Sequence, residues 1–247
     1  MKNITTWTPT KFHYRNNLLT ISENNRELGV GSRLIAIRVA QMYNKYLRVY
    51  ARGSLVDLGC GKVPLYEAYK EYVTENICVD WENTFHKNEL LDHECDLNKP
   101  LPLPDARFDT IILSDVLEHI QKPELLWLEM HRIMRPGGHI LLNVPFFYGI
   151  HESPYDYFRY TEFALRYFCE MAGFEVLELH SIGGTPEIMA DIFAKNVSHM
   201  PIFGYMIADV AQKVVLSLCK SWPVKNVSEK TKNYFPLGYF LVAQKSI

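Results

Sequence analysis

The chain has 247 residues, of which 48% are apolar, and its formal net charge is −2. This length suits one large α/β domain or a domain with an insertion, and the apolar fraction is enough for a full core without cross-links. A net charge so close to zero gives no sign of the basic surface that binds nucleic acid, so we expect no nucleic-acid partner.

The cysteines and the first residues of the chain indicate a compartment. No Cys-x-x-Cys pair occurs and the number of cysteines is odd, so free thiols in a reducing compartment are expected. The first residues, Met-Lys-Asn-Ile-Thr-Thr-Trp, lack the apolar core of a signal peptide. Together these features predict a cytoplasmic globular protein. The cysteines are Cys60, Cys78, Cys95, Cys169 and Cys219.

The N-terminal segment, residues 1–53, shows two different patterns. Residues 1–30 are polar and aromatic without clear periodicity, and loops are expected at residues 24–25 and 29–31. From Ser32, a candidate N-cap, to Arg52, polar side chains recur at helical spacing. This second pattern predicts an amphipathic helix with a solvated polar stripe.

A tight turn between a buried strand and a helix is predicted at residues 54–64, Ser-Leu-Val-Asp-Leu-Gly-Cys-Gly-Lys-Val-Pro. A short apolar run leads into Asp57, and Gly59 and Gly61 follow. Glycine suits such a turn because it bends sharply and lets a ligand touch the backbone. The layout is typical of a strand that feeds a turn beneath a bound nucleotide. A lone Gly-x-Gly is weak support, since many glycine turns bind nothing.

An acidic residue at the end of the next strand strengthens the nucleotide interpretation. Residues 65–72 are predicted to be helical, and residues 76–80 form a second buried strand that ends at Asp80. A carboxylate at this place can accept both ribose hydroxyls of a cofactor, and Trp81 can lie along the adenine. A surface Asp after a strand is the plain alternative. The order of strand, glycine turn, helix, strand and Asp favours the cofactor site.

Residues 57–61, Asp-Leu-Gly-Cys-Gly, resemble the first motif of class I methyltransferases that use S-adenosylmethionine. Val63 stands where a third glycine is usual, and the turn is similar to the Gly-Cys-Gly-x-x-Pro-Tyr variant of methyltransferases encoded with bacterial glycan pathways. A dinucleotide fingerprint needs Gly-x-Gly-x-x-Gly, so this departure argues against a dehydrogenase. The resemblance implies an α/β fold, with a Rossmann-like, seven-stranded, mostly parallel sheet and helices on both faces, and S-adenosyl-L-methionine as cofactor.

The same resemblance extends the cofactor site. It implies that Asp96 takes the adenine amino group and that Leu97 covers the ring. Residues 114–120, Ser-Asp-Val-Leu-Glu-His-Ile, match the family's fourth-strand signature and follow a clear strand at 108–114. The methyl donor should lie at the carboxyl end of that strand, because open α/β sheets bind ligands there. The predicted cofactor-binding residues are Asp57, Gly59, Cys60, Gly61, Asp80, Trp81, Asp96, Leu97 and Ser114.

Helix and strand signals outline the rest of the core. Residues 123–134 are predicted to be helical, and Arg-Pro-Gly-Gly at 135–138 should end that helix. An apolar strand is predicted at residues 139–144. We expect the methyltransferase core to span residues 54–184, with its final strand in residues 237–247.

The loop that follows the strand at 139–144 holds the best candidates for proton removal. Methyl transfer from a sulfonium is an in-line displacement, and a hydroxyl acceptor must lose its proton. A neutral histidine suits this task near pH 7. His151 is the first candidate for the base and His119 the second. The competing explanation is that a loop histidine is merely exposed.

The same loop also suggests acceptor-binding residues. Asp156 and Arg159 can bind sugar hydroxyls or a phosphate, with a purely structural Asp–Arg pair as the alternative. Tyr157 and its aromatic neighbours suit stacking on a sugar or aromatic ring, with core packing as the alternative. The run His-x-x-Pro-Tyr-Asp-Tyr-Phe-Arg-Tyr-Thr, from His151 onward, resembles the tail of glycan-cluster enzymes.

A divalent metal is a separate question. Asp115, Glu118 and His119 follow one another at i, i+3 and i+4, which puts them on one face if the chain is helical there. This arrangement resembles the Glu-x-x-Glu-His of ubiquinone-pathway and small-RNA methyltransferases, where such residues hold an ion near the acceptor hydroxyl. His151 could then be a fourth ligand instead of the base. Many metal-independent relatives carry the same Leu-Glu-His, so no metal ligand is assigned.

Residues 185–236 are predicted to be a helical insertion before the last strand. Residues 201–222 are apolar, but polar side chains fall on one helical face, which argues against a membrane-spanning helix. Packing against the core is expected; a homodimer interface or a shallow membrane contact is the alternative. The polar side chains are Asp209, Gln212, Lys213, Ser217 and Lys220.

The sequence therefore predicts an S-adenosylmethionine-dependent methyltransferase that methylates a hydroxyl of a sugar, nucleotide sugar or glycan. One alternative is a methyltransferase outside glycan metabolism, with an oxygen or nitrogen of a small molecule as acceptor. The other is a cofactor-binding partner subunit without catalysis. The resemblance also implies, by analogy, that residues 1–53 pack over the active site as a lid.

Overall fold

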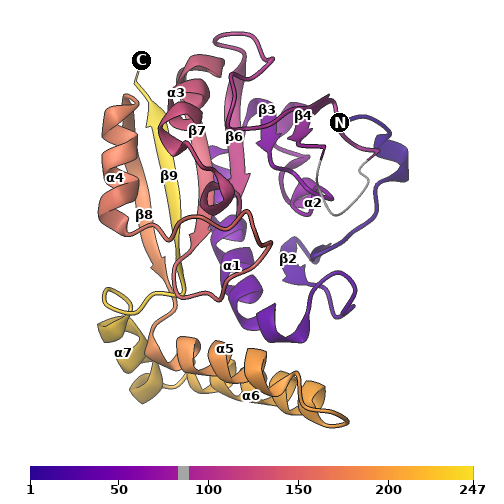
Figure 1. The fold of residues 1–247 in the computed structure, drawn as a ribbon, viewed down its shortest axis with the longest axis vertical. Helices are drawn as coiled ribbons and strands as arrows, with labels where there is room; N and C mark the ends of the chain where they lie inside the picture. Colours follow the sequence, from indigo (N-terminus) through magenta and orange to yellow (C-terminus); the bar gives the residue numbers. More distant parts are fainter. Residues whose placement is uncertain (83–88, 247) are drawn as a thin grey trace.

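The computed structural model describes residues 1–82 and 89–246. Its centre is a seven-stranded sheet in the order β5-β4-β3-β6-β7-β9-β8, beside a separate two-stranded sheet of β1 and β2 (Figure 1). The strands are β1 (Phe12–Arg15), β2 (Leu18–Ile21), β3 (Gly53–Leu58), β4 (Val73–Asp80), β5 (His93–Glu94), β6 (Phe108–Ser114), β7 (Met134–Pro145), β8 (Phe174–Ile182) and β9 (Gly238–Lys245).

The direction of the strands confirms the predicted Rossmann-like sheet. β3 pairs in parallel with β4 on one side and with β6 on the other. β4 with β5 and β6 with β7 are also parallel pairs, whereas β9 runs antiparallel between β7 and β8. The carboxyl ends of the parallel strands therefore meet at one edge, where ligands bind in such sheets.

Helices cover both faces of the sheet. Along β3, Val56 and Leu58 face the helices α3 and α4, and Leu55 faces α1. The helices are α1 (Arg33–Tyr50), α2 (Tyr66–Tyr69), α3 (Pro123–Ile133), α4 (Glu162–Met171), α5 (Thr185–Val197), α6 (Gly204–Leu218) and α7 (Trp222–Thr231), with short 3-10 helices η1 (Ile4–Thr6), η2 (Val30–Ser32) and η3 (Leu117–His119).

The N-terminal region contains a hairpin that the sequence did not predict. β1 and β2 form a hairpin whose two turn residues, Asn16 and Asn17, both have positive φ, 51° and 60°. Two-residue hairpin turns of this kind favour Asn because it tolerates the left-handed region. The helix predicted at 65–72 is also shorter, since α2 covers one turn. Ser32 does stand at the N-cap of α1, but no side-chain cap bond forms there; its hydroxyl lies 2.8 Å from that of Tyr148.

The Arg-Pro-Gly-Gly stretch lies within a strand, not between a helix and a strand. β7 already begins at Met134, which pairs with Phe108, and the next pair joins His139 to Thr110. Residues 135–138 therefore bulge out opposite a single residue of β6. The strand that we expected to start at residue 139 is thus longer than predicted.

The helices α5, α6 and α7 lie together beyond the C-terminal end of β8 (Figure 1). Two polar residues of α6 do not face water as a solvated stripe would. The Gln212 side chain accepts from Leu34 N at 2.8 Å and donates to Val30 O at 2.7 Å, and Asp209 pairs with Arg33 at 2.6 Å. In the described part of the chain, no helix is both long and apolar enough to cross a bilayer.

The buried carboxylate of Glu187 joins these helices to the core. It accepts hydrogen bonds from Ser228 Oγ of α7 at 2.8 and 3.0 Å and from Gly184 N at 3.1 Å. It also pairs with Arg38 of α1 at 2.7 Å. A single side chain thus connects α1, α5 and α7.

We expect Glu187→Ala to lower the free energy of unfolding by about 3–5 kcal/mol, because it leaves a largely buried arginine without its partner. Glu229→Ala is the matched control, since Glu229 is 56% exposed and pairs with Lys232 at the surface, where a pair contributes about 1 kcal/mol or less. Urea unfolding followed by circular dichroism measures both. Equal losses in the two variants would contradict this role of Glu187.

Candidate active site

The turn after β3 takes a shape that only glycine fits without strain. Gly59 and Gly61 have φ of 70° and 48°. A Cβ on Gly59 would lie 2.5 Å from Val116 Cγ2, so the backbone there passes close to the segment after β6. Val63, in the place of the usual third glycine, is also left-handed with φ 52° and is fully buried. Val63 therefore has the backbone conformation that the usual glycine would adopt freely at this position.

Asp80 is held at the end of β4 by two backbone donors. Gly61 N donates to one carboxylate oxygen at 2.9 Å and Trp81 N to the other at 2.8 Å. Burial raises the pKa of Asp80. Each oxygen keeps a further lone pair, as acceptance of two ribose hydroxyls requires.

A cavity next to Asp80 brings together most of the predicted cofactor residues. The rings of Trp81 and Tyr155 meet edge to face there, with centroids 4.8 Å apart. Partial burial alone would raise the pKa of Asp96, but hydrogen bonds from Asn98 and Lys99 lower it. The lining residues include Gly59, Gly61, Asp80, Trp81, Asp96 and Leu97. This cavity has the residues that the adenosine part of the cofactor would need.

A second cavity lies on the other side of the glycine turn and holds the remaining predicted residues. Burial and the nearby Asp80 charge raise the pKa of Asp57 to about 7. The Ser114 hydroxyl lies in the same cavity, 2.8 Å from Asn143 Oδ1. Asp57, Cys60 and Ser114 line it together with the two glycines. This cavity would take the methionine part.

A third cavity opens beside the loop that follows β7. It is lined by Lys11, Ser32, Glu118, His119, Tyr148 and His151, among others. Asp115 and Glu152 line all three cavities. The point where the cavities meet is therefore the place where a donor methyl group and an acceptor could face each other.

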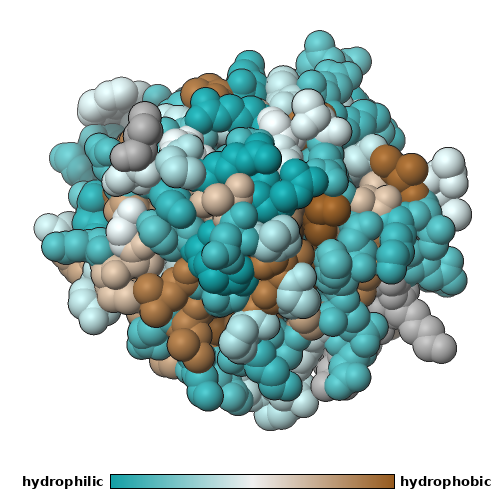
Figure 2. All heavy atoms as spheres, turned by 90° about the horizontal axis from the view of Figure 1, so that it is seen from above, coloured by the Kyte–Doolittle hydropathy of each residue, from teal (hydrophilic) through white to brown (hydrophobic). Residues whose placement is uncertain are grey.

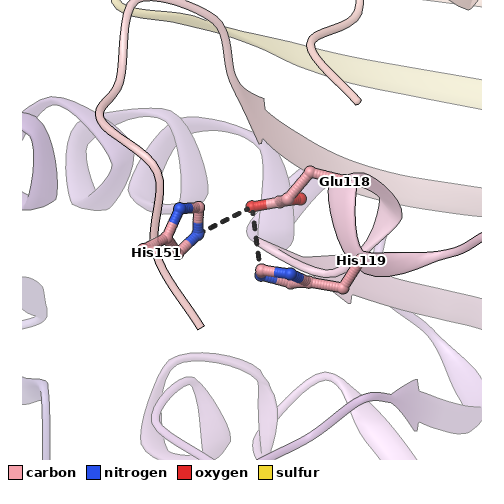
Figure 3. Close-up of side chains that lie close together, drawn as sticks. All are labelled: Glu118, His119 and His151. Carbon is pink, nitrogen blue, oxygen red and sulfur yellow. Dashed lines mark ion pairs between the residues drawn. The ribbon is translucent and has the colours of Figure 1, made fainter. Parts of the chain in front are cut away.

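Glu118, His119 and His151 converge in this third cavity (Figure 3). Glu118 and His119 come from η3, and His151 from the loop after β7. Nε2 of His151 lies 3.7 Å, and Nε2 of His119 3.8 Å, from Glu118 Oε1. Glu118 is completely buried, and neither carboxylate oxygen has a hydrogen-bond partner among the described residues. Burial raises its pKa.

Both imidazoles are oriented through their Nδ1 atoms. His119 Nδ1 lies 2.7 Å from the carbonyl oxygen of Tyr155, which can only accept. His151 Nδ1 lies 3.3 Å from Gly149 O and 3.3 Å from Asp156 Oδ2. Nδ1 therefore carries the proton in each neutral ring, and the lone pair of Nε2 faces Glu118. Burial alone would lower the pKa of His151, but Glu118 and Asp156 raise it.

Asp115 does not share a helical face with Glu118 and His119. It has φ 53°, and η3 starts two residues later, so the condition for one shared helical face is not met. Its carboxylate accepts from Lys11 Nζ at 2.9 Å and from Asn143 Nδ2 at 2.5 Å. The burial of Lys11 would lower its pKa, but the Asp115 carboxylate more than offsets this and raises it.

The three predicted acceptor-binding residues form ion pairs or hydrogen bonds with other residues of the protein. Arg159 forms a two-pronged pair with Asp156 at 2.6 and 2.8 Å, and Asp156 also accepts from His151 N at 2.9 Å. This pair lowers the pKa of Asp156 and orders the loop that carries His151. The Tyr157 hydroxyl bonds to Gln121 at 2.5 Å. For Asp156 and Arg159 these contacts favour the structural pair that the sequence left open, whereas Tyr157 is exposed and does not pack in the core.

Four residues of the site escaped sequence reasoning. Lys11, Tyr148, Glu152 and Tyr155 line the cavities, yet none was predicted as a site residue, although Glu152 and Tyr155 lie in the run from His151 onward. Tyr155 lies in the loop after β7, and the many aromatic residues of that loop were the available signal. Lys11 had none, because its partner Asp115 is far away in the sequence.

The potential ligand atoms of Glu118, His119 and His151 also fit a divalent ion. One oxygen of Glu118 and one nitrogen each of His119 and His151 lie within 4.8 Å of one another. Two imidazoles with one carboxylate suit zinc or other transition metals better than magnesium. The contacts of each Nδ1 are those that orient histidine ligands.

Residues 56–142 match the family model described as a methyltransferase domain. An uncharacterized methyltransferase of Schizosaccharomyces pombe is 26% identical over 125 residues, 42% of this chain and 45% of that protein. A probable S-adenosylmethionine-dependent methyltransferase of Mycolicibacterium smegmatis is 35% identical over 82 residues, 31% of this chain and 32% of that protein. The chain thus spans less than half the length of these curated relatives.

Solved structures share the fold at low identity. A methyltransferase of Haloferax volcanii, solved with the activator Trm112, has a TM-score of 0.58 at 17% identity over 91% of this chain and 95% of that one. An S-adenosylmethionine-dependent methyltransferase of Archaeoglobus fulgidus has a TM-score of 0.55 at 19% identity over 86% and 94%. The cyclase SpnF has a TM-score of 0.57 at 17% identity over 87% and 82%. The fold alone therefore does not determine the reaction.

The family match and the fold agree with each other. Residues 56–142 match a methyltransferase domain, the sheet has the fold of solved methyltransferases, and these findings support S-adenosylmethionine as the cofactor. The matched segment contains the glycine turn, Asp80, Asp96 and the Glu118–His119 pair, whereas His151 lies beyond it. The acceptor side of the site is thus the part that the family match leaves open.

We expect Asp80→Ala to weaken S-adenosylmethionine binding by about 2 kcal/mol, roughly 30-fold, because charge-assisted hydrogen bonds to the ribose are lost. Asp80→Asn keeps one acceptor oxygen and should lose less. Isothermal titration calorimetry measures both, with the exposed Asp105→Ala as control. An unchanged dissociation constant in a folded Asp80→Ala protein would remove Asp80 from the cofactor site.

Proposed function

We propose that this chain is an S-adenosylmethionine-dependent methyltransferase that methylates a hydroxyl group of a sugar, nucleotide sugar or glycan. The observation that carries the proposal is the position of the Glu118–His119–His151 cluster. It lies in a cavity that meets the cofactor cavities at Asp115 and Glu152. Two histidines with free Nε2 lone pairs suit removal of a hydroxyl proton. The sugar assignment rests on the resemblance of the loop from His151 onward.

His151 is proposed as the general base. Bound S-adenosylmethionine would supply the methyl group to the acceptor oxygen and leave without it, and His151 Nε2 would take the hydroxyl proton of the acceptor. The resulting imidazolium lies beside the buried Glu118 carboxylate, which stabilises the positive charge. Asp156 and Gly149 fix the ring through Nδ1. His119 is the second candidate for the same role.

His151→Ala should lower kcat by about 100- to 10,000-fold, the usual contribution of a general base, and leave the affinity for S-adenosylmethionine almost unchanged. His119→Ala is the matched comparison. Radiolabelled methyl transfer and calorimetry measure the two effects. Full turnover of the His151 variant at neutral pH would transfer the role to His119.

The pH profile gives an independent check on the His151 assignment. A base must be neutral to act, so a raised pKa moves the acidic loss of activity to a pH above 6.5, the usual value for histidine. Glu118→Gln removes the charge that raises this pKa and should move the acidic limb to lower pH. An acidic limb that stays in place would argue that another group is titrating.

A bound divalent ion is the competing mechanism. Glu118, His119 and His151 would hold it, and it would lower the pKa of the acceptor hydroxyl. We expect activity to survive exhaustive chelation if His151 is the base. If activity is lost and returns with magnesium, manganese or zinc added separately, the three residues are metal ligands instead.

A screen of acceptors tests two alternative functions, a methyltransferase outside glycan metabolism and a partner subunit without catalysis. The purified chain is offered nucleotide sugars, short glycans, and small alcohols and amines, with transfer read by mass spectrometry. Transfer to the small molecules alone would favour a methyltransferase outside glycan metabolism. Cofactor binding without transfer to any acceptor would favour a partner subunit.

A further inference from the structure

The helices α5 and α6 turn apolar side chains toward solvent. Met189, Ile192 and Phe193 of α5 are 67%, 45% and 50% exposed. Residues 206, 210 and 214 of α6 follow one another at i and i+4, which aligns them on one face. The exposed apolar residues of α6 and its flanks are Ile202, Phe203, Met206, Val210, Val214 and Leu218, at 48–89% exposure. A stripe of this kind normally packs against another surface.

The exposed charges of the same segment are almost all positive. Residues 185–236 contain six lysines and four acidic residues, although acidic residues outnumber basic ones in the whole chain. Three of the four acids, Glu187, Asp191 and Asp209, are largely buried in ion pairs. Glu229 is the exposed one. The exposed lysines are Lys213, Lys220, Lys225 and Lys230.

We propose that the exposed face of α5–α7 docks this protein on a membrane surface that carries anionic phospholipid. Apolar side chains would enter the headgroup boundary, and the flanking lysines would meet the lipid phosphates. Lys213 borders the apolar stripe of α6, since it stands one position before Val214 and three after Val210. Trp222 and Tyr234, at 78% and 76% exposure, are of the residue types that favour the membrane interface.

A second copy of the chain fits this face less well than a membrane. A symmetric dimer would place the same patch on both sides of the interface. Three exposed lysines, Lys220, Lys225 and Lys230, would then face three others, while Lys213 is paired with Asp209 and Glu229 with Lys232 within each copy. Like charges across an interface are unfavourable. Figure 2 shows the end of the molecule that lies opposite α5–α7, and this end is mostly hydrophilic.

Two residues of the helical insertion and its flank contact the loop that carries His151. Phe235, just beyond α7, contacts Phe147 of that loop with ring centroids 6.5 Å apart. Lys195 of α5 lies over the Tyr148 ring at 4.0 Å. Ile150, next to His151, is 85% exposed. A docked chain would therefore hold this loop close to the membrane.

The test is flotation of the full chain with vesicles of phosphatidylcholine alone or with about one third phosphatidylglycerol. We expect binding to the anionic vesicles that weakens as salt is raised. A charge variant, Lys220→Gln with Lys225→Gln and Lys230→Gln, should lower the partition coefficient on the order of 100-fold. An apolar variant, Met206→Gln with Val210→Gln and Val214→Gln, should lower it at least as much.

The matched control is Arg48→Gln with Val49→Gln, which removes one cation and one exposed apolar side chain from the far end of α1. It should bind as the unchanged chain does, and circular dichroism checks that every variant is folded. Absence of binding to anionic vesicles at low salt, or binding that neither triple variant weakens, would overturn the proposal. A dimer in sedimentation that the apolar variant dissolves, without vesicle binding, would assign the face to a second copy.

Discussion

The buried carboxylate of Glu118 is the constraint around which the candidate site is arranged. Removing a carboxylate from water costs several kcal/mol unless other groups compensate, and no hydrogen bond reaches either oxygen in the described part of the chain. Its nearest partners are two imidazole nitrogens at 3.7 and 3.8 Å. Because each ring is fixed at Nδ1, the cluster is prepared to receive positive charge at its centre. A transferred proton or a metal ion would each supply that charge.

The sheet explains why such a cluster can form beside the cofactor cavities. η3 follows β6, and the loop with His151 follows the neighbouring strand β7, so the two segments leave the same edge. The N-terminal segment then contributes Lys11 and Ser32 from the side of α1. Lys11 pairs with Asp115, and Ser32 with Tyr148. Residues from three distant parts of the sequence thus close one cavity.

Sequence patterns predicted the fold well because it depends on local rules. The continuous burial of β3, which is covered on both faces, and the glycine turn follow from residue type. The structure also brings the predicted residues Asp80, Trp81, Asp96 and Leu97 to one cavity. The acceptor side was less predictable. The left-handed backbone at Asp115 separates it from Glu118, and no spacing rule predicts that break. Long-range pairs such as Lys11–Asp115 leave no trace in a single sequence.

The polar stripe of α6 shows why a periodic pattern does not tell which face is inside. Asp209 and Gln212 share one helical face with other polar residues in the sequence, and in the structure they hold α6 to α1 and η2 through Arg33, Leu34 and Val30. With these polar groups turned inward, the apolar side of α6 is left on the outside. Buried polar groups are tolerated when hydrogen bonds satisfy them. An exposed apolar stripe has no such compensation, so another surface must cover it before its burial can stabilise the helix.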